Sequence, residues 1–352
     1  MEVVKFADIV TRVNTKEDRF NTDKIYYVGG DHIDSNELMV HQRGIIKGST
    51  IGPMFYCGFK AGDILFVTRN PHLRKCAVVD FDGICSEKTF VLATKDPSRL
   101  LQEYLALVMQ SDDFWNYCEE NKSGGVNFFL NWSTLADYEF SLPSIEEQKI
   151  IADKLWAAYR LKESYRQLLS TTDDMLHASF TKIKDAAQKS IPLSEICSVQ
   201  KGTTFTRGSA VNGTIPVIAG GQEPSCYHNV SNRDKDIITV SASGAYAGFV
   251  NFWSIPIFAS DCNTIKPKDA QNDVLFIYHG LKTMQKEIYK LQKGGAQPHV
   301  YGSDLEQFLF PQVSIEKQRE FVAIATQAEA TKASLRQSID AIDRVIRSLI
   351  NQ

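Results

Sequence analysis

Two stretches of the chain carry apolar residues at a helical spacing, one in the middle of the sequence and one at its end. In each stretch the steps alternate between four and three residues, which is the heptad seam of a coiled coil. The first seam has apolar or small residues at Ile151, Leu155, Ala158, Tyr165, Leu169, Leu176 and Ser179, with Lys162 and Thr172 at the two remaining steps. The second is Phe321, Ala325, Ala328, Lys332, Leu335, Ile339, Ile342, Ile346 and Leu349. This pattern predicts two long helices, over residues 144–188 and 314–352.

The two seams are copies of each other. Every position of the second equals a position of the first plus 170, so that the seam lysine recurs as Lys162 and Lys332. The same offset pairs identical residues upstream: Gly124 with Gly294, Gly125 with Gly295, Ser133 with Ser303, Leu135 with Leu305, Phe140 with Phe310, Ser144 with Ser314, Ile145 with Ile315, Glu146 with Glu316 and Gln148 with Gln318. The chain is therefore predicted to be two diverged copies of one unit, each a globular part followed by a helix.

Both helices have local signals for where they begin. Ser144 is placed to cap the first turn, and Glu147 stands three residues later, where its carboxylate reaches back to the cap. Pro143 prevents the preceding residue from being helical. In the second copy Ser314 can still cap, but Lys317 replaces the glutamate, so only half of this capping box is retained.

The globular parts, residues 1–143 and 189–313, alternate short apolar runs with turn residues. The strand candidates are "KIYYVGG", "DILFVTR", "KCAVVDF" and "KTFVLAT" in the first part and "IPVIAGG", "DIITVSA", "GFVNFW" and "NTIKPKD" in the second. A helical segment follows in each, "SRLLQEYLALVMQSDDFWNYCEEN" and "NDVLFIYHGLKTMQKEIYKLQ". Strands first and a helix afterwards favour an α+β fold with two repeated mixed domains over a doubly wound sheet.

A sustained heptad in both helices favours their pairing with each other. A helix of about 36 residues is about 55 Å long. Two repeated units related by a pseudo-twofold axis would place their helices side by side as an antiparallel coiled coil, a rod with one domain at each end. The alternative is that each helix merely packs on its own domain, but local packing does not require a sustained heptad.

Composition narrows the class of protein without assigning a chemistry. The chain has 352 residues, of which 43% are hydrophobic and 23% charged, enough for two or three domains. It has no apolar run long enough for a membrane span and no signal peptide, so we expect a cytoplasmic protein without membrane contact. Its seven cysteines show no metal-ligand spacing and are expected to be reduced thiols.

Sequence motifs of catalysis are missing. The sequence has no G-x-x-x-x-G-K-[ST] phosphate loop, no G-x-G-x-x-G after a strand, no H-E-x-x-H, no G-x-S-x-G and no Asp/Asn-Pro-Pro-aromatic tetrapeptide of amino-methyltransferases. No nucleophile, general base or metal site can be assigned from the residues, although an enzyme with atypical motifs stays open.

The order of the parts closely resembles the specificity subunits of type I restriction-modification enzymes. The resemblance is carried by "YEFSLPSIEEQKIIADKL" from Tyr138 and "QFLFPQVSIEKQREFVAIA" from Gln307, with the openings "FADIV" and "LSEICSVQKGTTF". It implies that residues 1–143 and 189–313 are target recognition domains, each reading one half of a split sequence in double-stranded DNA. The helix that follows each domain, 144–188 in the middle of the chain and 314–352 at its end, would be a spacer.

The resemblance also implies partners. Two methyltransferase (M) subunits would bind along the helices and supply S-adenosylmethionine-dependent adenine methylation, and motor and nuclease (R) subunits, where present, would supply ATP-driven cleavage. No cofactor and no catalytic residue is then expected in this chain. Relative to the family pattern the chain is compact, because it starts directly in the first domain and ends within the second helix.

The net charge of the chain is not the strongly basic charge that is typical of a DNA-binding protein. The formal net charge is −3, with 15 Lys and Arg against 20 Asp and Glu in residues 1–143 and 11 against 10 in residues 189–313. Attraction to phosphates must then come from local patches or from partner chains. The candidate basic and hydroxyl contacts are Arg12, Lys16, Arg19, Arg69, Arg74, Lys75, Lys201, Thr203, Thr204 and Arg207. Taken singly, each of these residues is better explained as part of a solvated surface loop.

Base reading requires side chains that present donors and acceptors in the grooves. In the second domain the candidates in turn-rich or glycine-rich stretches are Gln222, His228, Tyr246, Gln297 and His299. The stretches "SGGVNFFLNW" and "KGGAQPHVYG" share their glycines and then diverge, which fits one loop scaffold that carries unlike side chains. A simple turn before a strand explains the glycines equally well.

These observations predict a noncatalytic DNA-recognition subunit that reads an asymmetric bipartite site. A rod of about 55 Å corresponds to about 16 base pairs, so both domains can face one duplex. Two other classes of protein stay open: a self-contained DNA methyltransferase with atypical motifs, and a coiled-coil scaffold that binds only protein.

Overall fold

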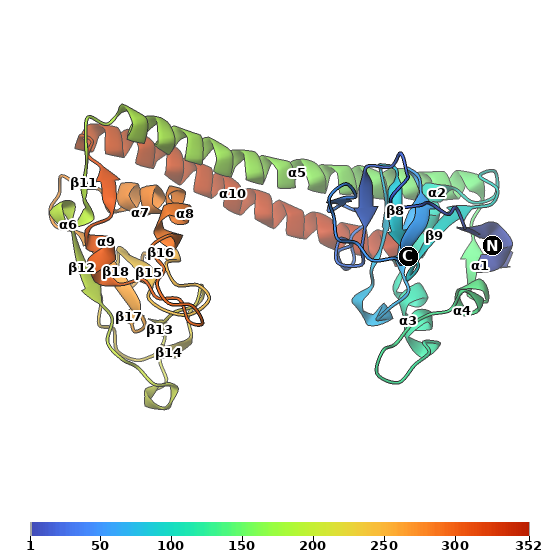
Figure 1. Cartoon of the computed structure of the whole chain (residues 1–352), viewed down its shortest axis with the longest axis horizontal. Helices are drawn as coiled ribbons and strands as arrows, with labels where there is room; N and C mark the ends of the chain where they lie inside the picture. Colours follow the sequence, from blue (N-terminus) through green and yellow to red (C-terminus); the bar gives the residue numbers. More distant parts are fainter. Residues whose placement is uncertain (1, 352) are drawn as a thin grey trace. The chain divides into compact units, whose positions relative to one another are not determined.

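The computed structural model describes residues 2–351, apart from the side chain of Arg207. The chain forms two compact units, one of Met1–Arg166 with Gln337–Gln352 and one of Gln167–Arg336. Two long helices, α5 (Ile145–Ala186) and α10 (Ile315–Ile350), each run through both units and are drawn in green and red in Figure 1. The helices thus begin and end close to the predicted positions. The assignment of 1–143 and 189–313 as recognition domains stays a prediction.

The first unit is built on two four-stranded sheets. One is antiparallel, in the order β2 (Val10–Val13), β9 (Thr89–Thr94), β6 (Ile64–Val67) and β7 (Cys76–Val78). The other has the order β4 (Gly44–Ile45), β3 (Tyr26–Val28), β8 (Gly83–Ser86) and β5 (Phe55–Phe59), with β3 parallel to β8. A third pair joins β1 (Glu2–Lys5) to β10 (Glu139–Leu142). The short helices are α1 (Phe6–Ile9), the 3-10 turn η1 (Pro71–Leu73), α2 (Gln102–Val108), α3 (Asp112–Glu120) and α4 (Trp132–Ala136).

The second unit repeats this plan. Its antiparallel sheet has the order β12 (Cys197–Lys201), β18 (Cys262–Pro267), β15 (Ile237–Ser241) and β16 (Val250–Trp253). A three-stranded sheet follows the order β14 (Cys226–His228), β13 (Ile215–Ile218) and β17 (Phe258–Ala259), with β13 parallel to β17. The pair β11 (Ser190–Pro192) and β19 (Leu309–Pro311) closes the unit. The short helices are α6 (Leu193–Ile196), the 3-10 turn η2 (Arg207–Ser209), α7 (Val274–Thr283), α8 (Gln285–Tyr289) and α9 (Gly302–Glu306).

The matching strand orders confirm the internal repeat and the α+β class. In both units the first strand pairs with the last, and the second strand lies at the edge of an antiparallel sheet of four. The single helical segment predicted before the twin glycines is two helices in each unit. In the first unit the break has a local cause, because the Ser111 Oγ accepts the Phe114 N–H at 3.2 Å and caps a new helix.

The start of α5 is the predicted capping box. Glu147 Oε2 accepts the Ser144 N–H at 3.0 Å, and the Glu147 N–H donates to the Ser144 Oγ at 3.3 Å. In the second copy, which lacks this glutamate, the Glu316 carboxylate accepts from its own backbone N–H and from the Ser314 hydroxyl, and both bonds hold the pKa of that carboxyl below its usual range. Both helices therefore start where a side chain can satisfy their free N–H groups.

One residue in each unit fastens the long helix to main-chain segments that precede it. Gln148, which is fully buried, donates to the carbonyls of Arg99 (2.8 Å) and Pro143 (3.0 Å) and accepts the Leu101 N–H at 3.0 Å. Gln318 does the same in the second unit, with the carbonyls of Gln271 (3.1 Å) and Val313 (3.0 Å) and the N–H of Asp273 (2.8 Å). The motif glutamine of the repeat is thus a staple between main chains.

The two helices pack antiparallel within each unit, as the heptad predicts. The first unit contains the start of α5 and the end of α10, and its Leu155 and Ile346 belong to one buried cluster. The second contains the end of α5 and the start of α10, where Phe180 and Phe321 pack with ring centroids 5.8 Å apart. All eighteen seam positions named above are buried or half-buried. None of the helices among residues 2–351 combines the length and apolar character that a membrane crossing needs.

Candidate nucleic-acid interface

The glycine stretch of the first unit forms a closed loop. Ser123 and Phe129 exchange both of their backbone hydrogen bonds, at 2.8 and 3.0 Å. Gly124 adopts a φ of +97°, a left-handed conformation that favours glycine at the tip of such a loop. The Asn70 N–H donates to the carbonyl of Phe128 at 3.0 Å, and the Leu130 N–H donates to the carbonyl of Thr68 at 2.9 Å. The loop is therefore held against the turn that follows β6.

The second unit contains the same loop, with the same bonds. Lys293 and His299 exchange backbone hydrogen bonds at 2.9 and 2.8 Å, and Gly294 has a φ of +95°. The Gly244 N–H donates to the carbonyl of Pro298 at 3.0 Å, and the Val300 N–H donates to that of Ala242 at 2.9 Å. The turn after β15 thus corresponds to the turn after β6, so that Ser243 occupies the position of Arg69.

A third segment joins this arrangement in each unit and was missed in the sequence. A pair of glycines follows β3 as 29–30 and follows β13 as 220–221. The carbonyl of Gly30 accepts the Lys75 Nζ at 2.6 Å, and the carbonyl of Gly221 accepts the Ser241 Oγ at 3.2 Å. A side chain at Gly220 would meet the carbonyl oxygen of Ser243 at 2.5 Å, so the backbones approach closely there. The signal was present as "VGGD" and "AGGQ", but at an offset of 191.

We name these three segments the loop triad. In the first unit the loop triad is residues 29–32, 68–70 and 123–129, and in the second it is 220–222, 242–246 and 293–299. The backbone scaffold recurs while the side chains differ. The first unit has Asp31, Arg69 and Asn127 where the second has Gln222, Ser243 and Gln297. The loop tips are open to solvent, since Val126 is 92% exposed.

The cations near the first loop triad differ in how they are held. Arg69 packs its guanidinium over the Phe129 ring, 5.2 Å from the centroid, and forms no ion pair within residues 2–351. Lys122 lies 4.4 Å from the centroid of Phe128 but is also paired with Glu119 at 2.6 Å. Arg69 therefore keeps a planar fork of donors, the geometry that suits guanine or a phosphate.

The other basic candidates of the first unit are spread over several elements. Lys75 reaches the loop triad through its bond to Gly30, whereas Arg74 is paired with Asp112 at 2.7 Å. Arg12 lies on β2 with its guanidinium 4.3 Å from the centroid of Phe90, and Arg19 lies 4.2 Å from that of Phe20. Lys16 is exposed and stands opposite Cys57. Their contact with DNA stays a prediction.

In the second unit the loop triad brings together four of the five base-reading candidates: Gln222, Tyr246, Gln297 and His299. Tyr246 is 47% exposed, and His299 stacks on Tyr301 with centroids 6.1 Å apart. His228 lies elsewhere, since its Nδ1 accepts the Val211 N–H at 3.1 Å and its ring packs on Phe205.

The "QKGTTFTRGS" stretch begins at the end of β12, passes β17 and ends with η2. Lys201, Thr203 and Thr204 are exposed, and the Thr203 N–H donates to the carbonyl of Ala259 at 2.9 Å. The side chain of Arg207 lies outside the described residues. These residues form a segment of their own, apart from the bonds that hold the loop triad together.

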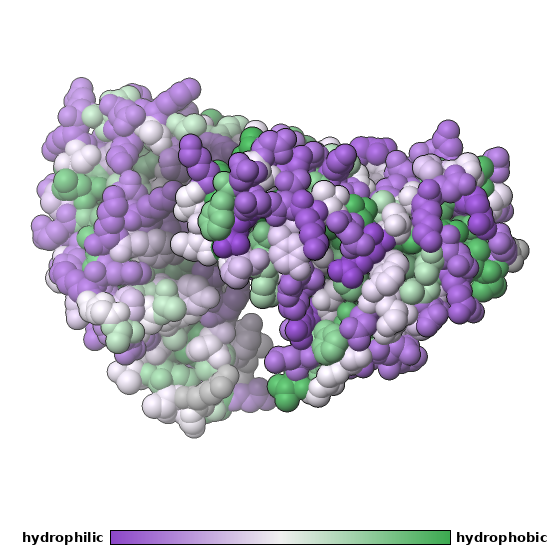
Figure 2. Space-filling view, turned by 45° about the vertical axis from the view of Figure 1, so that its right-hand side comes forward, coloured by the Kyte–Doolittle hydropathy of each residue, from purple (hydrophilic) through white to green (hydrophobic). Residues whose placement is uncertain are grey.

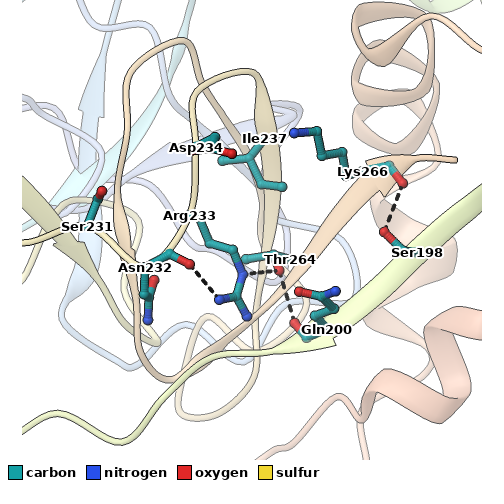
Figure 3. Close-up of a pocket in the computed structure, with 9 residues that line it drawn as sticks. All are labelled: Ser198, Gln200, Ser231, Asn232, Arg233, Asp234, Ile237, Thr264 and Lys266. Carbon is teal, nitrogen blue, oxygen red and sulfur yellow. Dashed lines mark hydrogen bonds between the residues drawn. The ribbon is translucent and has the colours of Figure 1, made fainter. Parts of the chain in front are cut away.

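A polar pocket of about 450 Å³ lies on the sheet of the second unit (Figure 3). Its central guanidinium belongs to Arg233, which donates to Thr264 Oγ1 at 3.0 Å and to the carbonyls of Asn232 (2.8 Å) and Lys201 (2.9 Å). Those three donors are used within the fold, so Arg233 ties the 231–234 turn to strands β12 and β18. The pocket is accordingly part of the scaffold and does not belong to the loop triad.

One group of side chains in the described part of the chain has the composition of a metal site. Glu37, His41 and Glu163 offer ligand atoms within 4.8 Å of one another. However, Glu37 accepts hydrogen bonds from Lys162 (3.1 Å), Arg166 (2.7 Å) and the Tyr159 hydroxyl (3.2 Å). The group is therefore an ion-pair network that joins the 35–43 loop to α5.

The face of the molecule that Figure 2 shows has no broad apolar area. Hydrophilic residues cover most of the visible face, and hydrophobic residues gather in small patches. This matches a protein whose contacts with a polar ligand are made by a few placed side chains.

Comparison with known proteins bears on the whole chain. A model of the family described as type I restriction modification DNA specificity domain matches residues 1–170 and 188–344. A Mycoplasma pneumoniae protein named as a type I specificity subunit is 24% identical over 246 residues, which are 63% of this chain and 64% of that protein. The matched stretch is thus less than two thirds of that relative's length.

Two solved structures share the fold. A crystal structure of the type I restriction-modification S subunit from M. genitalium superposes with a TM-score of 0.66 at 16% identity, covering 99% of this chain and 94% of that one. A structure from a study of complex assembly and conformational transition in a type I system gives 0.58 at 19% identity, covering 99% and 96%. At these identities the likeness establishes the fold.

Proposed function

Because the chain belongs to the family of type I restriction modification DNA specificity domains, we propose that it is the noncatalytic DNA-recognition subunit of a type I restriction-modification complex. One observation carries the proposal beyond family membership. The loop triad occurs twice on the same backbone scaffold and presents unlike side chains each time. Two readers that share a scaffold and differ in side chains would recognise two different half-sites, which makes the DNA site bipartite and asymmetric.

The partners proposed here are double-stranded DNA, two methyltransferase (M) subunits and, where present, motor and nuclease (R) subunits. The charge of the globular parts supports this division of labour. Residues 1–143 carry 15 Lys and Arg against 20 Asp and Glu, and residues 189–313 carry 11 against 10, so phosphate attraction beyond a few local cations must come from the partners. S-adenosylmethionine and ATP would bind in those partners, and adenine methylation and ATP-dependent cleavage would be activities of the assembled complex.

Mapping methylated adenines across a genome tests the proposal directly. Cells that contain the matching M subunit, with and without this chain, would be compared. Loss of one bipartite motif when the chain is absent is the expected result. Methylation of DNA by the purified chain alone would instead show that it is an enzyme, and protection of no DNA by the assembled complex would show that it binds only protein.

A matched pair of variants tests the loop triad itself. Arg69→Ser places in the first unit the residue type found at the corresponding position of the second, and we expect it to weaken or relax one half-site while the other stays unchanged. Lys60→Ala is the control, since Lys60 is an exposed lysine near the opposite end of β6. If both variants read the same motif as the natural chain, Arg69 does not read a base.

The spacing between half-sites is proposed to depend on the helices. Insertion of seven residues in register into both α5 and α10 should change the number of base pairs between the half-sites and leave both half-sites readable. A change of half-site sequence with an unchanged gap would overturn this part of the proposal.

A further inference from the structure

Two cysteines of the first unit face each other across neighbouring strands. Cys57 on β5 and Cys85 on β8 are antiparallel register partners. Directly opposite residues have side chains on the same face of a sheet, with Cα atoms about 4.5 to 5.5 Å apart. A disulfide requires Cα atoms about 4.4 to 6.8 Å apart, so strands of this kind can be bridged without moving the backbone.

Both thiols pack against the same hydrophobic cluster of the first unit. Cys85 is fully buried in a cluster that includes Val28, Phe59 and Val91, and the half-buried Cys57 packs against that same cluster. The Cys57 thiol is therefore reachable from solvent, whereas the Cys85 thiol is buried next to it. This is the arrangement of an attacking and a resolving cysteine.

The surroundings of Cys57 favour its thiolate. Hydrogen bonding with the Cys85 thiol, outweighing burial, and the charges of Arg12 and Lys16 lower the pKa of Cys57 to about 7. Lys16 stands opposite Cys57 on the other side of β5, in a segment held by the Gly58 N–H to Thr15 carbonyl bond at 2.9 Å. The same hydrogen bond and burial raise the pKa of Cys85, so it stays protonated until its partner reacts. Thiolates, not thiols, react with peroxides.

We propose that Cys57 and Cys85 form a reversible, peroxide-sensitive dithiol that oxidises to an intrachain disulfide between β5 and β8. The Cys57 thiolate attacks one oxygen of hydrogen peroxide, breaks the O–O bond and becomes a sulfenic acid, with release of hydroxide. The Cys85 sulfur then attacks the Cys57 sulfur, the S–O bond breaks, and the Cys85 proton leaves with the hydroxyl group as water. In total, two thiols and one peroxide give one disulfide and two waters, and a reducing dithiol reverses the reaction.

The test uses the full chain and does not depend on its proposed role on DNA. The protein is treated with hydrogen peroxide, its free thiols are blocked with a maleimide, and non-reduced peptides are identified by mass spectrometry. The expected result is loss of two reactive thiols per chain and one peptide pair joined through Cys57 and Cys85, reversed by a reducing dithiol. Oxidation should slow below the pKa of about 7 of the Cys57 thiol.

Variants separate the two roles. Cys57→Ser should abolish the linked peptide. Cys85→Ala should leave a sulfenic acid on Cys57 that a dimedone probe traps. The matched control is Cys226→Ser, which removes the other half-buried cysteine and should change nothing.

Two outcomes would overturn the proposal. One is oxidation of Cys226 as fast as Cys57 with no linked pair, and the other is formation of disulfides only between chains. Cys57 is half-buried, on a strand whose other side faces the 15–17 segment, so its serine variant is expected to fold. The test therefore does not depend on the Cys85→Ala variant, which changes a fully buried residue.

Discussion

The two units bury the same seam lysine and give it different partners. Lys162 pairs with Glu37 (3.1 Å), from a loop of the globular part, and with Asp343 (2.8 Å) on α10. Lys332 pairs with Asp173 (2.6 Å) and Glu329 (2.9 Å), both on the long helices. The lysine–aspartate contact recurs with the offset of 170, so the repeat preserved it. Only the first unit uses its lysine to fasten the globular part as well.

The second unit fastens its globular part with aromatic packing instead. Phe180 on α5 and Phe321 on α10 lie 5.6 and 5.8 Å from Phe276 of α7, measured between ring centroids. Gly280 admits these rings, because a side chain there would meet Phe180 at 2.6 Å. Both units thus keep the main-chain staple and the helix seam. The first adds an ion-pair network to the apolar contacts of Leu38 and Leu107 with the helices, and the second has a cluster of phenylalanines at the corresponding place.

The largest expected effect tests what the units share. Gln148→Leu and Gln318→Leu each leave one N–H and two carbonyls without their partner, and we expect each to lower the free energy of unfolding by about 3 kcal/mol. Hydrogen exchange by mass spectrometry, read in peptides of each unit, should show equal loosening of the variant's own unit. A large loss in one unit and none in the other would show that the staples are not equivalent.

The second prediction separates the units. Glu37→Gln should destabilise the first unit by about 2 kcal/mol, less than a fully buried pair because Arg166 is 37% exposed. Asp173→Asn, which removes a carboxylate beside Lys332, should have no measurable effect because the Asp173 side chain is 60% exposed. Urea unfolding of both full-length variants provides the measurement. Equal shifts of the two midpoints would contradict the comparison.

Replacing each seam lysine by methionine should also change stability differently in the two units, although the difference should be smaller. Lys162→Met leaves the buried Glu37 one cation short and should cost about 1 kcal/mol. Lys332→Met should be neutral or slightly stabilising, because Asp173 and Glu329 can rehydrate. Thermal unfolding midpoints would register both, and a larger loss for Lys332→Met would mean that the second lysine is the structural one.

The smallest effect is on pH dependence. Burial would raise the pKa of Glu37, but the hydrogen bond from Arg166 and the charge of Lys162 outweigh it and hold that pKa below its usual range. The carboxylate's stabilising contribution is therefore complete above the unfolded pKa and is lost as pH falls through the folded one. The stability difference between the natural chain and Glu37→Gln should shrink in acid. A difference that is constant with pH would show that Glu37 is not acting as a charge.

The pKa of Lys332 is shifted in the opposite direction to that of Glu37. Burial would lower its pKa, but hydrogen bonds to Asp173 and Glu329 raise it above its usual value. Its contribution is present at all lower pH values and is lost only as pH rises through that raised pKa. Acid should therefore act on the first unit through Glu37, whereas the ammonium of Lys332 keeps its charge as pH falls.

Sequence periodicity predicted the parts of this fold that depend on local spacing. The helix starts at Ser144 and Ser314 and the eighteen-residue seam follow from repeats of three and four, and the α+β class follows from short alternating runs. Strands β5 and β8 were missed because each interrupts its apolar run with small residues, as in "FYCGF" and "GICS".

The sites depended on contacts that no local pattern contains. Glu37 is 125 residues from Lys162 in the sequence, and the facing of Cys57 and Cys85 follows from the pairing of two strands. In the loop triad, Gln297 was found because the 170-residue offset marked its loop, whereas the glycine pairs escaped because insertions gave them another offset. Arg12, Lys16 and Arg19 were chosen from local composition, which does not say which elements meet.

Closure of the 123–129 and 293–299 loops by main-chain bonds has a consequence for how such proteins diverge. Residues 125–128 and 295–298 contribute no side chain to the bonds that close their loops, so stability places little constraint on which side chains they carry. Mutations there can accumulate nearly neutrally with respect to folding, and a library randomised at these tips should retain folded members at high frequency. A new recognition sequence would then arise by drift at the tips alone, with the scaffold inherited intact.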